Sequence, residues 1–272
     1  MVQVRSVMLV AVALHLAGCR GVLGIEDPVV RADASPGGVD GPGQPDAPSV
    51  TDALGEGDAA PVGPRLVHLG HWGSDADVST YTFDAVPLGA ATLGRHVIVI
   101  SHGRSPVSAF GAATVTIGAG PSATRVIMAN EFATGGTTAV HIAAVPDGLT
   151  SAAITLSFAG GLGDRRAAIG VWVADGLSSA APFDVAAVED GTNVVPLALD
   201  LRADGVFVAG ASIGTLEGIT PATWAGADEQ YEVVVATTLT SGAAGTSAAA
   251  EVRALTFSAA DNSIHVVAAS FR

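Results

Sequence analysis

The chain has 272 residues, with 26 acidic residues against 12 basic ones and a formal net charge of −14 at neutral pH. This balance argues against a nucleic-acid partner, because phosphate binding requires clustered positive charge. Aromatic residues make up only 5% of the chain, so we expect a core of Val, Ile, Leu and Ala. The single cysteine, Cys19, allows no disulfide within one chain.

The first 18 residues have the organisation of a secretory signal peptide. Arg5 is the only charged residue, the uncharged and largely apolar run Val7–Leu16 follows it, and small residues lead to Cys19. The apolar run is too short to span a bilayer, and no later run reaches the roughly 18 to 20 apolar residues that would. We therefore expect residues 1–18 to be removed during export.

The residues around the expected cleavage point carry a family resemblance. Leu16-Ala17-Gly18-Cys19 resembles the lipobox of bacterial lipoproteins, [LVI]-[AST]-[GA]-C, at every position. The resemblance implies cleavage between Gly18 and Cys19 and attachment of the lipid to Cys19. Arg20, in place of an aspartate at the next position, implies the outer membrane of a Gram-negative bacterium. Whether the protein faces the periplasm or the exterior stays open.

Residues 19–64 have the composition of a linker. Between Arg20 and Pro64 there are seven Pro and nine Gly, several Asp and no aromatic residue. Such a segment buries too little apolar surface to offset the entropy lost on ordering. We expect a disordered tether that spans roughly 35 Å if it behaves as a flexible coil.

From Leu66 onward, short runs rich in β-branched residues alternate with Gly, Pro, Asp and Ser, which is typical of strands. The expected strands are 66–72, 96–102, 113–118, 124–129, 139–145, 153–158, 167–174, 193–199, 206–211, 231–238 and 263–271. Four Asp-Gly pairs between these runs, at 147–148, 175–176, 190–191 and 204–205, favour tight antiparallel hairpins.

These patterns predict one all-β domain over 65–272. No long helical period is present, and the best helix candidate is the short segment 247–255. We expect eleven to thirteen strands in two packed antiparallel sheets, a β-sandwich of jelly-roll type. The sequence shows no repeat of fixed period of the kind that would indicate a propeller.

The folded region also resembles β-sandwich modules of phage tail and virion proteins and of bacterial surface proteins. The stretches that carry this resemblance are VTIGAGPSATRV (115–126), AVHIAAVPDGLTSAAITLSF (139–158), VWVADG (171–176) and TWAGADEQYE (223–232). It implies a structural or binding unit, and it brings no catalytic residues with it.

One motif points to an enzyme instead. Gly210-Ala211-Ser212-Ile213-Gly214 fits the G-x-S-x-G pattern of α/β-hydrolases, with Asp261 and His265 downstream in the matching order. That nucleophile must open a helix, whereas TLEGITPATWAG follows here. We therefore expect no catalytic site and keep a hydrolase using Ser212 as the alternative.

Neither a metal nor another cofactor is expected. His68 and His71 lie three positions apart on an expected strand, which places them on opposite faces of a regular sheet. Asp75 and Asp77 offer oxygen ligands for calcium, but a solvated acidic turn is the favoured interpretation, and calcium binding stays open.

The candidate binding residues are aromatic. Trp224, Tyr81 and Phe110 fall in the longest irregular segments (73–95, 104–112 and 215–230), where loops carry recognition. Trp172 lies inside an apolar strand and is expected in the core. The leading hypothesis is a lipid-anchored, non-enzymatic protein that binds or displays an envelope protein or neutral glycan. A purely structural envelope protein is the third alternative.

Overall fold

The computed structural model describes residues 63–105, 113–120, 122–131, 136–159, 165–214, 221–260 and 263–272. All of them belong to one compact unit, Glu56–Arg272. The predicted signal peptide, the predicted lipidation site Cys19 and the predicted tether up to residue 62 lie outside the described residues. In the described part of the chain, no helix is long and apolar enough to cross a membrane.

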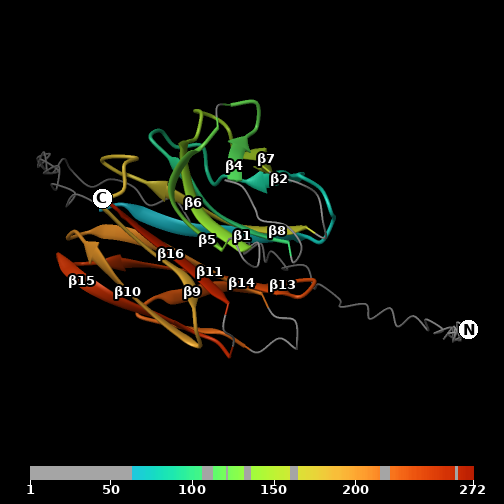
Figure 1. Cartoon of the computed structure of the whole chain (residues 1–272). Coiled ribbons are helices and arrows are strands. Elements are labelled where there is room, and N and C mark those ends of the chain that lie inside the picture. Colours follow the sequence, from blue (N-terminus) through green and yellow to red (C-terminus); the bar gives the residue numbers. More distant parts are fainter. Residues whose placement is uncertain are drawn as a thin grey trace, which may run out of the picture. The chain divides into compact units, whose positions relative to one another are not determined.

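The described residues form sixteen β-strands (Figure 1). The strands are β1 (Arg65–Ser74), β2 (Thr80–Pro87), β3 (His96–Arg104), β4 (Ala113–Ile117), β5 (Thr124–Glu131), β6 (Gly136–Ala144), β7 (Ser151–Phe158), β8 (Arg166–Asp175), β9 (Asp184–Gly191), β10 (Val194–Leu201), β11 (Gly205–Gly214), β12 (Thr223–Ala225), β13 (Asp228–Val235), β14 (Thr238–Ser247), β15 (Glu251–Ser258) and β16 (Ile264–Phe271). Every pairing between them is antiparallel.

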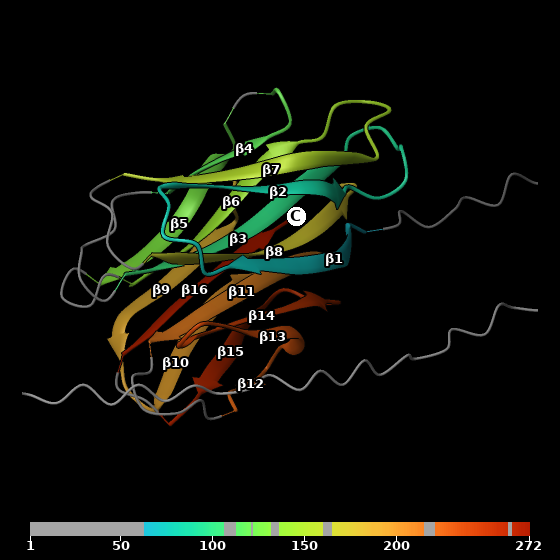
Figure 2. The ribbon, with the colours of Figure 1, turned by 90° about the vertical axis from the view of Figure 1, so that its right-hand side faces the viewer.

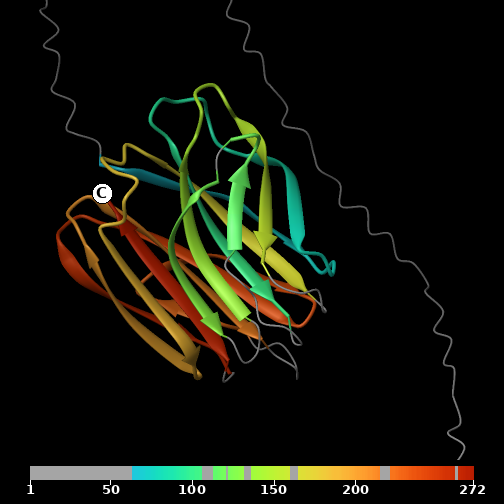
Figure 3. The same ribbon diagram turned by 45° about the horizontal axis from the view of Figure 1, so that its top comes forward.

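The strands build four sheets. Sheet A has the order β1-β8-β3-β6-β5, sheet B β2-β7-β4, sheet C β13-β14-β11-β16-β9, and sheet D β10-β15-β12. Figure 2 shows them as four layers in the order B, A, C, D, and Figure 3 shows the same layers from another side. The two five-stranded sheets, A and C, are therefore the inner layers.

The two halves of the chain repeat one topology. Adding eight to each strand number converts sheet A into sheet C and sheet B into sheet D, strand for strand. If the strands of each half are counted from 1 to 8, strands 1, 8, 3 and 6 lie side by side in one sheet, and strands 2, 7 and 4 form the facing sheet. This is the strand order of a jelly roll. The fifth strand of each half pairs with the sixth, at the edge of the inner sheet.

A shared irregularity fixes the residue-level match between the halves. The β5/β6 ladder pairs Arg125 with His141 and then shifts by one residue before Ile127. The β13/β14 ladder does the same after Glu229 and before Tyr231. In both hairpins this bulge follows the second pair of the ladder, so Arg125 is equivalent to Glu229 and Val126 to Gln230.

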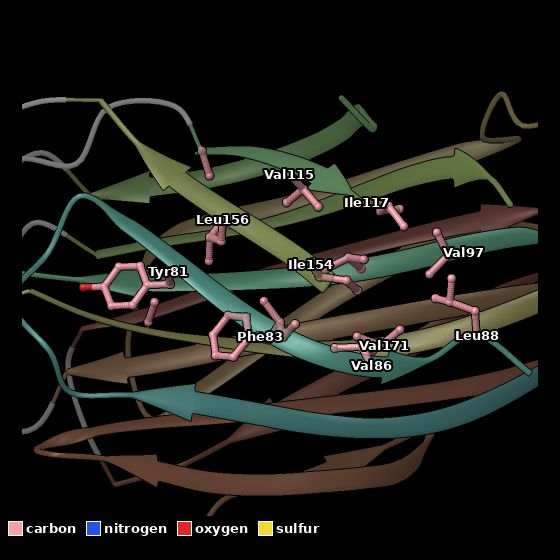
Figure 4. Packing of buried hydrophobic residues seen from close by; sticks show 14 of the residues in the cluster. Tyr81, Phe83, Val86, Leu88, Val97, Val115, Ile117, Ile154, Leu156 and Val171 are labelled. Atoms are coloured by element: carbon pink, nitrogen blue, oxygen red, sulfur yellow. The ribbon is translucent and has the colours of Figure 1, made fainter. Parts of the chain in front are cut away.

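Three hydrophobic clusters fill the spaces between the layers. One lies between sheets B and A and includes Tyr81, Phe83 and Val97 (Figure 4). Its counterpart between sheets C and D is built around Phe207 and Phe257. The third joins the inner sheets A and C and thereby joins the two halves.

The inner strands have apolar residues on both faces because both faces are covered. Along β3, Val97 and Val99 belong to the cluster with sheet B, whereas Ile98 and Ile100 belong to the cluster with sheet C. Strands β11 and β16 are buried at every position. Such strands appear in the sequence as continuous apolar runs, and these were the runs that predicted strands most clearly.

The predicted fold class, an all-β antiparallel sandwich of jelly-roll type, is confirmed, but its extent was underestimated. There are four sheets instead of two and sixteen strands instead of eleven to thirteen. Strand β2 was read as loop because its buried and exposed positions alternate with polar residues facing out. The best helix candidate, 247–255, is not a helix, since this segment contains the end of β14 and the first part of β15.

The Asp-Gly pairs do not form the hairpins that we predicted. Each of the four connects strands of different sheets, for example Asp147-Gly148 between β6 in sheet A and β7 in sheet B. Gly148 and Gly176 still adopt positive φ values of 79° and 74°, as Asp-Gly turns require. The turns reverse the chain between layers. The prediction of antiparallel strands is therefore correct, but the hairpins on which we based it are not formed by the Asp-Gly pairs.

Tyr231 of β13 shows how closely the inner sheets approach. Its side chain is 4% exposed and lies over Gly170 of β8 and Gly242 of β14. A β-carbon at either glycine would overlap the phenol ring. The two glycines therefore provide the space that Tyr231 occupies between sheets A and C.

We predict that Gly242→Ala destabilises the protein by about 1–3 kcal/mol, because the added methyl group overpacks the ring of Tyr231. Chemical denaturation followed by intrinsic fluorescence measures the change. The same substitution in a Tyr231→Leu background is the control, and it should cost clearly less. Equal costs in both backgrounds would show that Tyr231 is not what Gly242 accommodates.

Candidate functional site

Ser212 is not placed as a nucleophile elbow would place it. It lies inside β11, which continues to Gly214, and its side chain is 3% exposed. Its Oγ lies 2.7 Å from Oγ1 of Thr138 on β6. His265 is its cross-strand neighbour on β16 and is 1% exposed, while Asp261 lies outside the described residues.

Ser212 belongs instead to a buried polar chain between the inner sheets. Oγ1 of Thr138 also lies 3.4 Å from Nδ1 of His102, and Nε2 of His102 lies 2.8 Å from the hydroxyl of Tyr231. All four side chains are nearly inaccessible to solvent. Hydrogen bonds within this chain satisfy polar groups that would otherwise be costly to bury.

Burial sets the protonation of the histidines in this region. It lowers the pKa of His102 to about 3. It also lowers the pKa of His141 to about 4, with a smaller contribution from Arg125. The phenol of Tyr231 has a raised pKa for the same reason. The interior of the unit therefore holds neutral imidazoles at physiological pH.

His68 and His71 do not lie on opposite faces, and that prediction is wrong. A β-bulge between His68 and Gly70 inserts one residue into β1 and reverses the alternation of side chains beyond it. The two rings are stacked, with centroids 6.4 Å apart and planes 7° apart. Both also stack on Tyr231, at 5.6 and 5.2 Å.

The acidic turn at Asp75 and Asp77 has a structural contact. Oδ1 of Asp77 accepts a hydrogen bond of 3.0 Å from the backbone nitrogen of Arg165. Among the described residues, no group of three or more His, Cys, Asp or Glu side chains is arranged to hold a metal ion.

Two of the predicted binding aromatics, Tyr81 and Trp224, lie in different sheets. Tyr81 lies in β2 and is 3% exposed, and its hydroxyl donates to the carbonyl of Ala76. The expectation that it lies outside the strands is therefore wrong, because β2 was missed. Trp224 is half-buried in β12, where its ring packs on Phe257 and Nε1 donates to Oγ of Ser241 at 2.8 Å. Phe110 lies outside the described residues, and a binding role for these residues stays a prediction.

Two crevices occur at equivalent positions of the repeated topology. The β1/β13 crevice has a volume of about 170 Å³, and its lining includes His68 and Trp172 as well as Asp228, Gln230 and Thr246. The β5/β6 crevice has a volume of about 410 Å³, and the equivalent positions in its lining are Thr124, Val126 and Ala144. Sequence reasoning missed both, because each joins segments that are distant in the chain.

The two crevices differ in chemistry although their backbones correspond. At the equivalent positions, the β1/β13 crevice has a carboxylate, an amide and a hydroxyl where the β5/β6 crevice has one threonine and two apolar residues, although His96 and Arg125 also line the β5/β6 crevice. Convergent polar groups in a concave site are typical of specific ligand binding. The β1/β13 crevice is therefore the candidate functional site.

No protein-family model, curated protein or solved structure matches this chain. The assignment of function therefore rests on the sequence and on the geometry described above.

We predict that the stability of the protein falls as the pH decreases below about 6.5, the pKa of an unperturbed histidine. Histidines of the unfolded chain bind protons there, whereas His102 and His141 stay neutral until about pH 3 and 4. The contribution of the two neutral histidines to the free energy of unfolding is complete above pH 6.5 and declines as the pH is lowered. Between pH 6.5 and 5 the loss is about 2 kcal/mol for each histidine.

Urea denaturation at half-unit pH steps measures this loss. The variant His102→Gln/His141→Gln should show a clearly flatter dependence between pH 6.5 and 5, whatever its stability at pH 7.5. If stability depends on pH as steeply in this variant as in the wild type, the two buried histidines are not the cause of the loss.

We also predict that Ser212 does not react with a fluorophosphonate probe, because its hydroxyl is buried within a strand and bonded to Thr138. Intact mass spectrometry after incubation should show no adduct on the wild type, with a known serine hydrolase as the positive control. Stoichiometric labelling that disappears in Ser212→Ala would establish the hydrolase alternative instead.

Proposed function

We propose that this protein is a lipid-anchored, non-enzymatic binding protein of the bacterial cell envelope. The observation that carries the proposal is the lipobox ending at Cys19, followed by a Pro/Gly/Asp-rich segment that leads directly to the folded unit. Strand β1 begins at Arg65, one residue after that segment ends. The proposed order is thus anchor, spacer and folded unit.

Binding is favoured over catalysis because of how the polar side chains are used. The serine of the hydrolase motif lies in a strand interior, and its hydroxyl is bonded to another buried hydroxyl. Jelly-roll sandwiches serve as binding and structural units in many unrelated proteins. Fold alone does not choose between them, so the choice depends on a site.

The overall charge restricts the ligand. A formal net charge of −14 repels anionic glycans and nucleic acids and leaves neutral sugars, cationic partners or envelope proteins as candidates. The resemblance to phage tail, virion and bacterial surface modules supports the same class of function. A purely structural envelope protein is the alternative, and the presence of a polar crevice favours binding over it.

We predict that Cys19 carries the lipid and that the mature chain fractionates with the outer membrane. Several acyl chains should anchor it almost permanently, since each buried methylene contributes about 0.8 kcal/mol. Mass spectrometry of the N-terminal peptide and membrane fractionation test this prediction. The variant Cys19→Ala should be released from the membrane, and an unmodified Cys19 in the membrane-bound wild type would refute the lipoprotein assignment.

A further inference from the structure

The floor of the β1/β13 crevice contains buried polar atoms without partners. Trp172 is 0% exposed, and within the described part of the chain its Nε1 makes no hydrogen bond. Nε2 of His68 is likewise buried and unbonded there. Buried indole N–H groups are usually hydrogen-bonded, so an unbonded one beside a cavity points to a polar occupant.

The rim of the crevice provides complementary polar groups. The exposed side chains of Asp228, Gln230 and Thr246 line it. They are a carboxylate acceptor, an amide that donates and accepts, and a hydroxyl that does both. Together with the floor nitrogens, they require a ligand whose groups both donate and accept hydrogen bonds. Hydroxyl groups have this property.

The electrostatics exclude an anionic ligand. Among the described residues of the lining, Asp228 is the only charged side chain and none is an arginine. The pKa of His68 is lowered, chiefly by burial and also by His71, so the floor imidazole is neutral at physiological pH. The site therefore suits an uncharged polyhydroxylated ligand.

The volume limits the size of the ligand. At about 170 Å³ the crevice is smaller than the roughly 300–1,000 Å³ of pockets that take drug-sized molecules. One sugar ring fits this limit better than an oligosaccharide does. The rings of His68 and Trp172 have centroids 5.0 Å apart and planes tilted by 46°, and Trp172 is 0% exposed, so these two rings offer no open platform and hydrogen bonds would have to hold the sugar.

We propose that the β1/β13 crevice binds a single neutral sugar unit through Asp228, Gln230 and Thr246. The assignment rests on the proposed binding function and names its ligand class. The floor nitrogens are closed to solvent, so binding requires a shift of side chains at the rim. Gln230 and Thr246 are exposed and allow that shift.

The repeated topology supplies a built-in comparison. At the positions equivalent to Asp228, Gln230 and Thr246, the β5/β6 crevice has Thr124, Val126 and Ala144. The position equivalent to Trp172 is Ala269 of β16, which belongs to the same cluster between the inner sheets. The combination of Asp228, Gln230 and Thr246 therefore occurs in only one of these two crevices, although the strands around both pair in the same register.

The indole N–H signals of the three tryptophans provide the test. The full chain carrying Cys19→Ser is labelled with ¹⁵N and titrated separately with D-glucose, D-galactose, D-mannose, D-glucuronate and choline. The Trp172 signal is assigned with Trp172→Phe. We expect at least one neutral sugar to shift it with millimolar affinity, while the signals of Trp72 and Trp224 stay in place.

Two variants test the rim. The double variant Gln230→Val/Thr246→Ala copies the residues of the β5/β6 crevice and should weaken binding at least about tenfold, the effect expected for lost hydrogen bonds. Thr124→Ala in the β5/β6 crevice is the matched control and should leave the affinity unchanged. Unchanged tryptophan signals in the sugar-free variants confirm that the fold is retained.

The proposal is overturned if no neutral sugar shifts the Trp172 signal, or if glucuronate or choline shifts it as strongly. It is also overturned if the double variant binds as well as the wild type. These failures differ from failure of the proposed function. A protein that is lipidated at Cys19 and captures an envelope partner, yet leaves Trp172 unmoved in sugar, binds through another surface.

Discussion

The fold depends on the packing of sheet A against sheet C. Ile98, Ile100 and Val140 from one half meet Val206 and Val267 from the other, and all five side chains are fully buried. At about 1.5–3 kcal/mol for each buried aliphatic side chain, this cluster contributes enough to make the two halves one unit. It also requires the inner strands to be apolar on the face turned away from their own outer sheet. A jelly roll that exposed this face would present a large apolar patch to water.

This double burial explains which strands the sequence reveals. Strands β3, β8, β11 and β16 are buried almost throughout and appear as apolar runs, so they were predicted. The missed strands have other patterns. β2 alternates buried with exposed positions, β15 begins with exposed and half-buried positions, and β14 is largely buried but made mostly of Thr, Ser, Gly and Ala. Small residues pack well between closely spaced sheets, but a sequence segment rich in Gly, Ser and Thr is typical of a loop.

The internal repeat was invisible for a related reason. Along β3 and β11, whose registers correspond, no equivalent position has the same residue in both strands. Ile100 of one half faces the space that Gly210 of the other half leaves open, and a β-carbon at Gly210 would lie 2.5 Å from Ile100. At this equivalent position, one half therefore has a large residue and the other a small one, and the two pack against each other across the interface. Packing conserves the summed volume at such an interface, so each half can change its residues while topology and bulge persist.

The candidate site was unpredictable because it depends on bulges and on the repeat. The bulge in β1 turns His71 to the same side as His68, and the bulge in β13 lies at Gln230, on the rim of the crevice. A one-residue insertion has no signature in a single sequence, but it reverses which side chains face a neighbouring sheet. The resemblance of residues 16–19 to a lipobox, by contrast, can be recognised because these residues are contiguous, and lipidation at Cys19 stays a prediction.

The seam between the halves is also where a ligand can have the largest effect. Each half places a hydrophobic cluster between its inner and its outer sheet. At the seam, His102, Thr138 and Ser212 already form hydrogen bonds across sheets A and C. The rim of the β1/β13 crevice comes from β13 and β14 and its floor from β1 and β8, so an occupant would contact both halves at once.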